Sequence, residues 1–234
     1  LTFETGFDGF PVWSPDGDRV AFRTNRKGLF DLFETSPGIR GSDSPLVESS
    51  QSKVPNSWSR DGRFLLYYSV DPVTGRDIWV RPLDGDRKPV PFLNTRADEF
   101  NGQFSHDGRW VAYESNESGQ SEIYVRPFPV RAGQVQISTS GGFSARWRPD
   151  GKELYYVATD GMLMAVPVTV SGATLEPGKP VALFRPHMVT TTVSSRQQYD
   201  VAADGRFLIN VTSDDATASP ITVLQNWKPP VSQP

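Results

Sequence analysis

Five aspartates recur along the chain at nearly regular spacing, and a glycine follows each of them. They are Asp16, Asp61, Asp107, Asp150 and Asp204, separated by 45, 46, 43 and 54 residues. Carboxylates brought together could bind a cation or act as a general acid and base. Each Asp-Gly pair, however, stands between apolar runs, as in "WSPDGDRVAF". Asp accepts backbone hydrogen bonds in tight turns and Gly adopts positive φ, so we assign these carboxylates to hairpin turns.

The turn is part of a longer repeat. Related segments are "WSRDGRFLLY", "FSHDGRWVAY", "WRPDGKELYY" and "VAADGRFLIN". The third unit reads as four short strands, "EFNGQFSHD", "RWVAYESN", "EIYVRPF" and "GQVQIST". Four strands in units of about 40–50 residues are typical of a propeller blade. We therefore expect an all-β propeller of five blades, each with four antiparallel strands and its opening aromatic residue packed between blades.

The repeats divide the chain without remainder, so we expect one domain over residues 1–234. The predicted blades are residues 5–50, 51–97, 98–140, 141–185 and 186–234. The last unit ends in "ITVLQNW" and lacks a fourth strand, which residues 1–4 would supply. Such closure removes an exposed sheet edge. The alternative is that the chain is part of a ring of six or more blades.

Composition excludes several classes of function. The chain has 24 basic and 27 acidic residues and a net charge of -3, so it shows no basic footprint for nucleic acid. It has no cysteine, which excludes disulfides and thiolate metal sites. The two histidines, His106 and His187, are expected in an exposed turn and a loop. No apolar run reaches the ~18 residues of a membrane helix, and we expect no membrane insertion.

Positions that differ between the units should lie near the propeller axis, where the innermost strands begin. Five residues before the opening aromatic position stand Asp8, Lys53, Glu99, Gly142 and Arg196. Three residues before it stand Phe10, Pro55, Asn101, Ser144 and Gln198. A mixed polar ring suits hydrogen bonding to a peptide or a small polar ligand. The candidate binding residues at this channel mouth are Asp8, Phe10, Lys53, Asn56, Glu99, Asn101, Ser144, Arg196 and Gln198.

Two other uses of this ring remain open. Asp8, Asp98 and Glu99 could serve a glycan-active hydrolase, which needs two carboxylates at a defined separation. Asp8 and Glu99 could instead hold a structural Ca²⁺ with backbone oxygens, and no other cofactor is expected. A hydrolase predicts carboxylates that face each other across the channel. A binding module predicts that Lys53 or Arg196 neutralises the acids.

The repeat motif is distinctive enough to suggest a family. It is carried by residues 13–17, 58–62, 104–108 and 147–151, and by "DIWVRP" (77–82) and "EIYVRP" (122–127). These segments resemble the WD-like repeats of TolB-type β-propellers, which are related to the propellers of the prolyl oligopeptidase group. The ending "ITVLQNW" (221–227) is similar to that of propeller regions linked to bacterial serine/threonine kinases. The fifth unit departs from the pattern, with Val201, Ala202 and Ala203 in place of Trp-Ser-Pro.

The resemblance implies a bacterial, non-enzymatic platform that binds a protein, a peptide or a small polar ligand near the central channel. It favours a periplasmic or other extracytoplasmic location, and a monomer if the ring is complete. Because a fold alone does not fix function, the hydrolase remains an alternative. A structural or sensor domain of a larger receptor-type kinase is a further alternative.

Overall fold

The computed structural model describes residues 4–130, 133–186, 188 and 197–211. Within these ranges all regular secondary structure is β-strand, and every strand pair is antiparallel. No helix there is long and apolar enough to cross a membrane. The prediction of an all-β chain built from four-stranded antiparallel sheets is confirmed.

The strands follow the repeat units in order. The first blade contains β1 (Asp8–Trp13), β2 (Val20–Thr24), β3 (Asp31–Thr35) and β4 (Ser44–Val47). The second contains β5 (Lys53–Trp58), β6 (Phe64–Asp71), β7 (Gly75–Pro82) and β8 (Val90–Leu93). The third contains β9 (Glu99–Phe104), β10 (Trp110–Ser115), β11 (Glu122–Pro127) and β12 (Val135–Gln136). The fourth contains β13 (Phe143–Trp147), β14 (Glu153–Val157), β15 (Leu163–Ser171), β16 (Thr174–Pro177) and β17 (Val181–Phe184).

The last unit is described only in part. Its strands β18 (Tyr199–Val201) and β19 (Phe207–Ile209) form a two-stranded sheet. The predicted strand at 221–227 and the closing residues Leu1–Phe3 lie outside the described residues, as does His187. Glu4 lies in a bend and in no strand. The fourth blade also differs from the prediction, because both β16 and β17 pair with the long strand β15.

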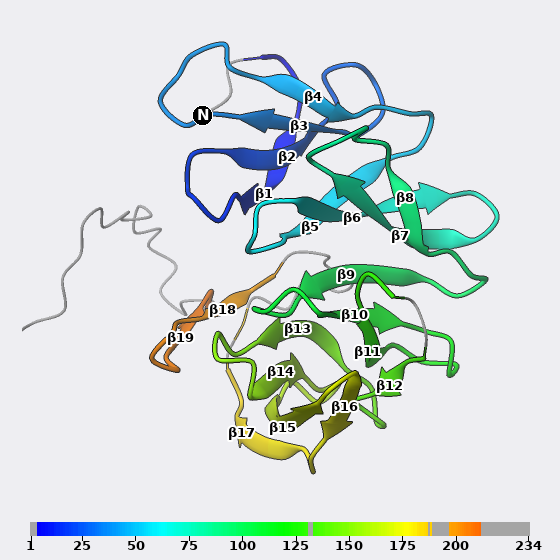
Figure 1. The fold of residues 1–234 in the computed structure, drawn as a ribbon, viewed down its shortest axis with the longest axis vertical. Helices are drawn as coiled ribbons and strands as arrows, with labels where there is room; N and C mark the ends of the chain where they lie inside the picture. Colours follow the sequence, from blue (N-terminus) through cyan, green and yellow to red (C-terminus); the bar gives the residue numbers. More distant parts are fainter. Residues whose placement is uncertain (1–3, 131–132, 187, 189–196, 212–234) are drawn as a thin grey trace, which may run out of the picture.

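The blades succeed one another around a common centre (Figure 1). The innermost strands contact each other in chain order, β1 with β5, β5 with β9, β9 with β13 and β13 with β18. This arrangement brings the beginnings of all repeat units to one place. It therefore positions the residues that precede the opening aromatic of each unit.

The Asp-Gly turns act as structural elements, as predicted. In the third unit the Ser105 hydroxyl donates to Asp107 Oδ1 at 2.6 Å, and the Arg109 backbone N–H donates to the same oxygen at 3.1 Å. The Trp110 backbone N–H donates to Ser105 Oγ at 3.0 Å. Gly108 has a φ of 70°, which is left-handed and open to glycine without strain. The turn thus fixes the register of the inner hairpin.

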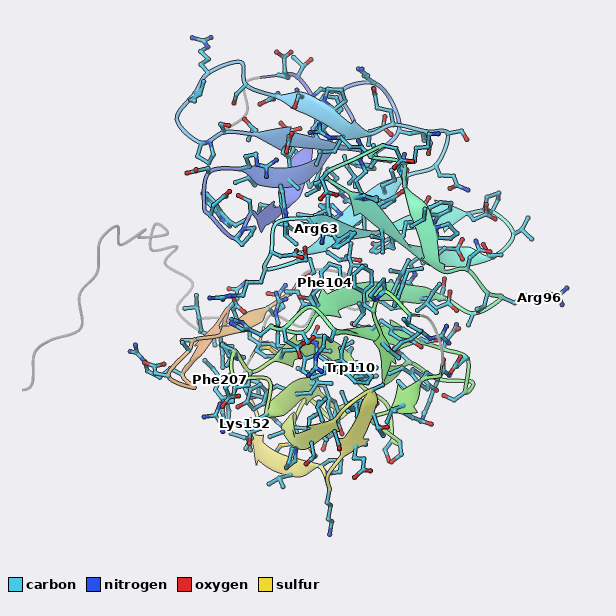
Figure 2. All side chains as sticks on the ribbon, in the orientation of Figure 1. Arg63, Arg96, Phe104, Trp110, Lys152 and Phe207 are labelled. Carbon is cyan, nitrogen blue, oxygen red and sulfur yellow. The ribbon has the colours of Figure 1, made fainter. Side chains whose placement is uncertain are left out.

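Apolar side chains fill the spaces between successive blades. Leu32, Trp58 and Leu65 pack between the first and second blades, Ile78, Phe104 and Val111 between the second and third, and Ala112, Trp110 and Leu154 between the third and fourth. Figure 2 labels Phe104 and Trp110 in this interior.

The opening aromatic of the first unit is an exception to the predicted packing. Trp13 is 53 % exposed, whereas Trp58 is 8 % exposed. Trp58 packs against the preceding blade. The corresponding neighbour of Trp13 would be the last blade, of which only β18 and β19 are described. The prediction that this aromatic is buried between blades is wrong for Trp13 in the described structure.

Replacing the turn carboxylate should weaken the fold. Asp107→Ala removes the acceptor of two donors, so we expect the free energy of unfolding to fall by about 1–2 kcal/mol in urea titrations. Partial burial opposes ionisation, but the hydrogen bonds from Ser105 and Arg109 lower the pKa of Asp107. This contribution is therefore present near neutral pH and is lost as the pH falls through the lowered pKa.

Asp107→Asn is the matched control, since its amide oxygen can still accept the hydrogen bonds of Asp107. It should retain most of the stability at neutral pH. Wild-type stability in Asp107→Ala would show that the turn does not depend on this carboxylate.

Candidate functional site

A cavity of about 690 Å³ lies where the inner strands meet. It is lined by Phe7, Asp8, Gly9, Phe10, Pro11, Val12, Pro55, Asn56, Asn101, Gln103, Arg146, Gln197, Gln198 and Asn210. These residues belong to the first four blades and to the described part of the last unit. A volume of this size is typical of pockets that bind small molecules or short peptide segments.

The inner strands β1, β5, β9 and β13 each carry an irregularity in their pairing. The pairing register shifts between Gly9 and Val12, and between Phe143 and Arg146. Phe10, Asn101 and Ser144 have φ values of 57°, 54° and 58°. A bulge of this kind re-aims side chains, and non-glycine residues at positive φ concentrate at functional sites. Proline cannot adopt positive φ, so Pro55 gives the second blade a different conformation at this position.

The structure brings most, but not all, of the predicted site residues to the cavity. Those that line it are Asp8, Phe10, Asn56, Asn101 and Gln198, together with Pro55. Lys53, Glu99 and Ser144 are buried and do not line it. Arg196 lies outside the described residues.

Two of the residues that do not line the cavity, Lys53 and Glu99, have side-chain partners elsewhere in the structure. Lys53 Nζ donates to Asp31 Oδ1 at 2.8 Å and to the Gln51 carbonyl at 2.6 Å, at 1 % exposure. Glu99 accepts a hydrogen bond from the Thr95 hydroxyl, and burial raises the pKa of its carboxyl. The predicted role of Lys53 as a neutraliser of Asp8 or Glu99 is therefore wrong, since Asp31 takes that charge.

Two side chains of the cavity lining were not predicted from the sequence. Gln103 and Arg146 stand directly before the opening aromatics of their units. Arg146 Nη1 donates to Gln103 Oε1 at 2.5 Å, and Gln103 Nε2 donates to the Asn56 carbonyl at 3.2 Å. Arg146 Nε donates to the Tyr199 carbonyl at 3.3 Å. We call this chain of hydrogen bonds from Asn56 through Gln103 and Arg146 to Tyr199 the inter-blade belt.

An aromatic wall stands on the first-blade side of the cavity. The Arg23 guanidinium lies 4.0 Å from the centroid of the Phe10 ring and 5.4 Å from that of Phe7. It also lies 4.2 Å from the Phe30 ring, which packs edge-on against Phe7. Cation–π contacts of this kind hold rings in place. Phe7 and Phe10 therefore give the cavity an ordered aromatic surface on the first-blade side.

Two buried oxygen acceptors at the cavity remain unpartnered among the described residues. They are Asn56 Oδ1 and Gln197 Oε1. A buried acceptor without a donor costs free energy. Because the protein covers both oxygens, a bound N–H group can pair with them only after the two amides turn toward the cavity. Six amide side chains of the described residues line the cavity, namely Asn56, Asn101, Gln103, Gln197, Gln198 and Asn210. This lining can form several hydrogen bonds to a polar ligand.

Asp8 is the one carboxylate on the described lining of the cavity. Both of its oxygens lie 3.5 Å from Arg26 Nη2, and Arg26 Nη1 is bound to Asp43 at 2.8 Å. Glu99, the expected second acid, is turned into its blade. The described residues contain no group of three or more His, Cys, Asp or Glu side chains placed to hold a metal ion.

Behind the cavity wall lies a buried carboxyl, Glu114. Its Oε1 accepts hydrogen bonds from Asn101 Nδ2 at 2.7 Å and from the Ser144 backbone N–H at 2.8 Å. Glu114 thus ties together the positive-φ residues of two neighbouring blades. Burial raises the pKa of Glu114 to about 7, although both hydrogen bonds act in the opposite direction.

We expect Glu114 to make the stability of the chain depend on pH. Its pKa in the fold lies above the unfolded value of 4.5, so the folded state binds more protons between these two values. Stability should fall as the pH rises from about 4.5 to about 7, by on the order of 3 kcal/mol from this group. Urea titrations across this range should show a smaller decline for Glu114→Gln. Replacement of the exposed Glu176 by Gln is the control, and an identical decline in wild type and Glu114→Gln would contradict this prediction.

Comparison with known proteins supports the fold. No protein-family model matches the sequence, and no curated protein matches it. Among solved structures, a TolB described as putative from Agrobacterium tumefaciens has a TM-score of 0.62 at 18 % identity, over 79 % of this chain and 71 % of that one. TolB from Acinetobacter baumannii has a TM-score of 0.62 at 15 % identity, over 86 % of this chain and 53 % of that one.

Two further structures show how widely the architecture recurs. A prolyl endopeptidase has a TM-score of 0.54 at 18 % identity, over 76 % of this chain and 28 % of that one. A chain from a nidogen/laminin complex has a TM-score of 0.55 at 10 % identity, over 79 % of this chain and 78 % of that one. The chain therefore spans only about half of the Acinetobacter protein and a smaller part of the endopeptidase. At these identities the comparisons establish the fold, and this fold is that of a TolB-like β-propeller.

Proposed function

We propose that the chain is a non-enzymatic binding platform that holds a peptide segment of a partner protein, or a small polar ligand, in the cavity. The observation that carries this proposal is the cavity lining, in which six amides from several blades converge and two buried acceptors have no partner among the described residues. An extended peptide presents N–H and C=O groups along its length. Such a segment can accept hydrogen bonds from the amides of the lining, and it can donate to Asn56 Oδ1 and Gln197 Oε1 once these side chains turn their covered oxygens toward the cavity.

The aromatic wall supports a peptide over a fully polar ligand. Phe10, Pro11 and Val12 give one side of the cavity an apolar surface that side chains of a peptide can cover. Pockets that combine apolar walls with a few fixed polar groups are typical of ligand sites. The TolB and nidogen structures agree with an interaction propeller at the level of fold.

A glycan-active hydrolase is the less favoured alternative. Hydrolysis by two carboxylates needs both at the scissile bond, with a separation of roughly 5–10 Å. The described cavity lining offers Asp8 alone, and Arg26 lies beside it. Glycosidase activity that is lost in Asp8→Asn would favour the hydrolase over the platform.

Affinity selection of short peptides tests the platform. Acetylated, amidated random hexapeptides are captured on the immobilised chain, and the dissociation constants of retained peptides are measured by calorimetry. We expect Asn56→Ala and Gln197→Ala to weaken binding about tenfold each, because each removes an acceptor from a buried hydrogen bond.

Val73→Ala is the control for these variants. Val73 is 88 % exposed on the turn between β6 and β7, away from the cavity lining. Equal affinity for wild type and both cavity variants would place the peptide elsewhere. Failure of the chain to retain any peptide would contradict the platform itself.

We further propose that residues 1–234 form one five-bladed ring in which Leu1–Glu4 complete the last blade. One feature supports this: Phe7, which follows these residues closely in the chain, and Asn210 of the last unit line the same cavity. Deletion of residues 1–4 should then lower the melting temperature by several degrees, since an outer strand is lost. An unchanged melting curve in calorimetry would exclude this form of closure.

A further inference from the structure

Arg146 is a cation on the cavity wall whose charge is only partly compensated. Its side chain is 20 % exposed, and the nearest carboxylate oxygen, Asp200 Oδ1, lies 3.7 Å from Nε. Nη1 and Nε donate to the neutral oxygens of Gln103 and Tyr199. Nη2 has no hydrogen-bond partner among the described residues, so this donor remains for a ligand.

The compensation from Asp200 is weak. Its side chain is 74 % exposed, and an ion pair with an exposed partner at this distance contributes little in water. Burial lowers the pKa of Arg146, and the nearby Asp200 only partly opposes this effect. A buried guanidinium without a close anion is costly, and a carboxylate ligand would reduce that cost.

No other described residue of the cavity lining carries a positive charge that could attract a carboxylate. Arg146 is the one basic side chain on it, and Asp8, the one acid, is beside Arg26 on the first blade. The other polar side chains are neutral amides. The charge of Asp8 is thus compensated by Arg26, whereas Arg146 places a positive charge on the fourth-blade side of the cavity.

We propose that the cavity selects ligands that carry a carboxylate, and that Arg146 recognises this group through Nη2. The inference rests on the proposed binding function and names the chemistry of the ligand. The carboxylate can belong to an acidic side chain or to the C-terminus of a peptide, because both present the same acceptor oxygens. Phe10 and the amides hold the remainder of the segment, and Arg146 sets its direction across the cavity.

Three synthetic hexapeptide libraries test this selectivity on the full chain. One contains Asp and Glu and has amidated C-termini, and the second replaces these residues with Asn and Gln. The third is also free of Asp and Glu but has a free C-terminal carboxylate. Each retained peptide is titrated against wild type beside its matched neutral form.

We expect acid-bearing peptides to bind about tenfold more tightly than their neutral forms, a typical effect of a charge-assisted hydrogen bond. Preference for the first library assigns the carboxylate to a side chain, and preference for the third assigns it to the C-terminus. Arg146→Gln should reduce the preference to less than about twofold, whereas Arg146→Lys should retain part of it. Arg185→Gln is the control, since Arg185 is 60 % exposed and does not line the cavity.

The outcomes separate the two proposals. If acidic and neutral peptides bind wild type equally and both lose affinity in Asn56→Ala, the proposed acid selectivity is wrong but the proposed peptide-binding function is supported. An undiminished acid preference in Arg146→Gln overturns the role of Arg146. If the chain retains no peptide from any of the three libraries, both proposals are contradicted. If Arg146→Gln does not fold, the paired titrations on wild type and Arg146→Lys still decide between acidic and neutral ligands.

Discussion

The structure depends first on the hydrogen bonds of the Asp-Gly turn. In the first three units one Asp oxygen accepts from a Ser hydroxyl and from a backbone N–H two residues further along. The fourth and last units lack the Ser, yet Asp150 and Asp204 still accept the backbone N–H groups of Lys152 and Arg206. A turn that is fixed in this way fixes the pairing register, and register decides which side chains face the axis.

From this fixed end, the inner strands of the first four blades run back to a bulge. The bulge changes the direction of the strand, so residues on its two sides do not alternate as in a regular strand. Asp8 and Phe10 face the cavity, whereas Lys53 and Glu99, at the repeat position of Asp8, are buried within the second and third blades. The mixed lining of the cavity thus arises from irregular backbone as much as from variation in sequence.

These features show what the sequence could and could not predict. The repeat and its turn chemistry were sufficient for the four-stranded sheets, because Asp-Gly and alternating apolar residues are local signals. Counting back from the aromatic found Phe10, Asn101 and Gln198 but misplaced Lys53, because its partner Asp31 belongs to another blade and leaves no local signal near Lys53. Gln103 and Arg146 were missed because their partners belong to other blades. One signal was available: the units carry different residues directly before the opening aromatic, which marks this position as a candidate for the cavity lining.

The inter-blade belt has a consequence for how such a chain can change over time. In most repeat proteins each unit contacts its neighbours through similar surfaces, so units can be duplicated or exchanged. Here Gln103 must accept from Arg146 and donate to the Asn56 carbonyl, and Arg146 must reach the carbonyl of Tyr199. Because of these contacts, the second, third and fourth blades cannot exchange positions around the axis without losing hydrogen bonds. A shuffled arrangement would separate Gln103 from Arg146, and the part of the cavity wall that these two residues form together would be lost.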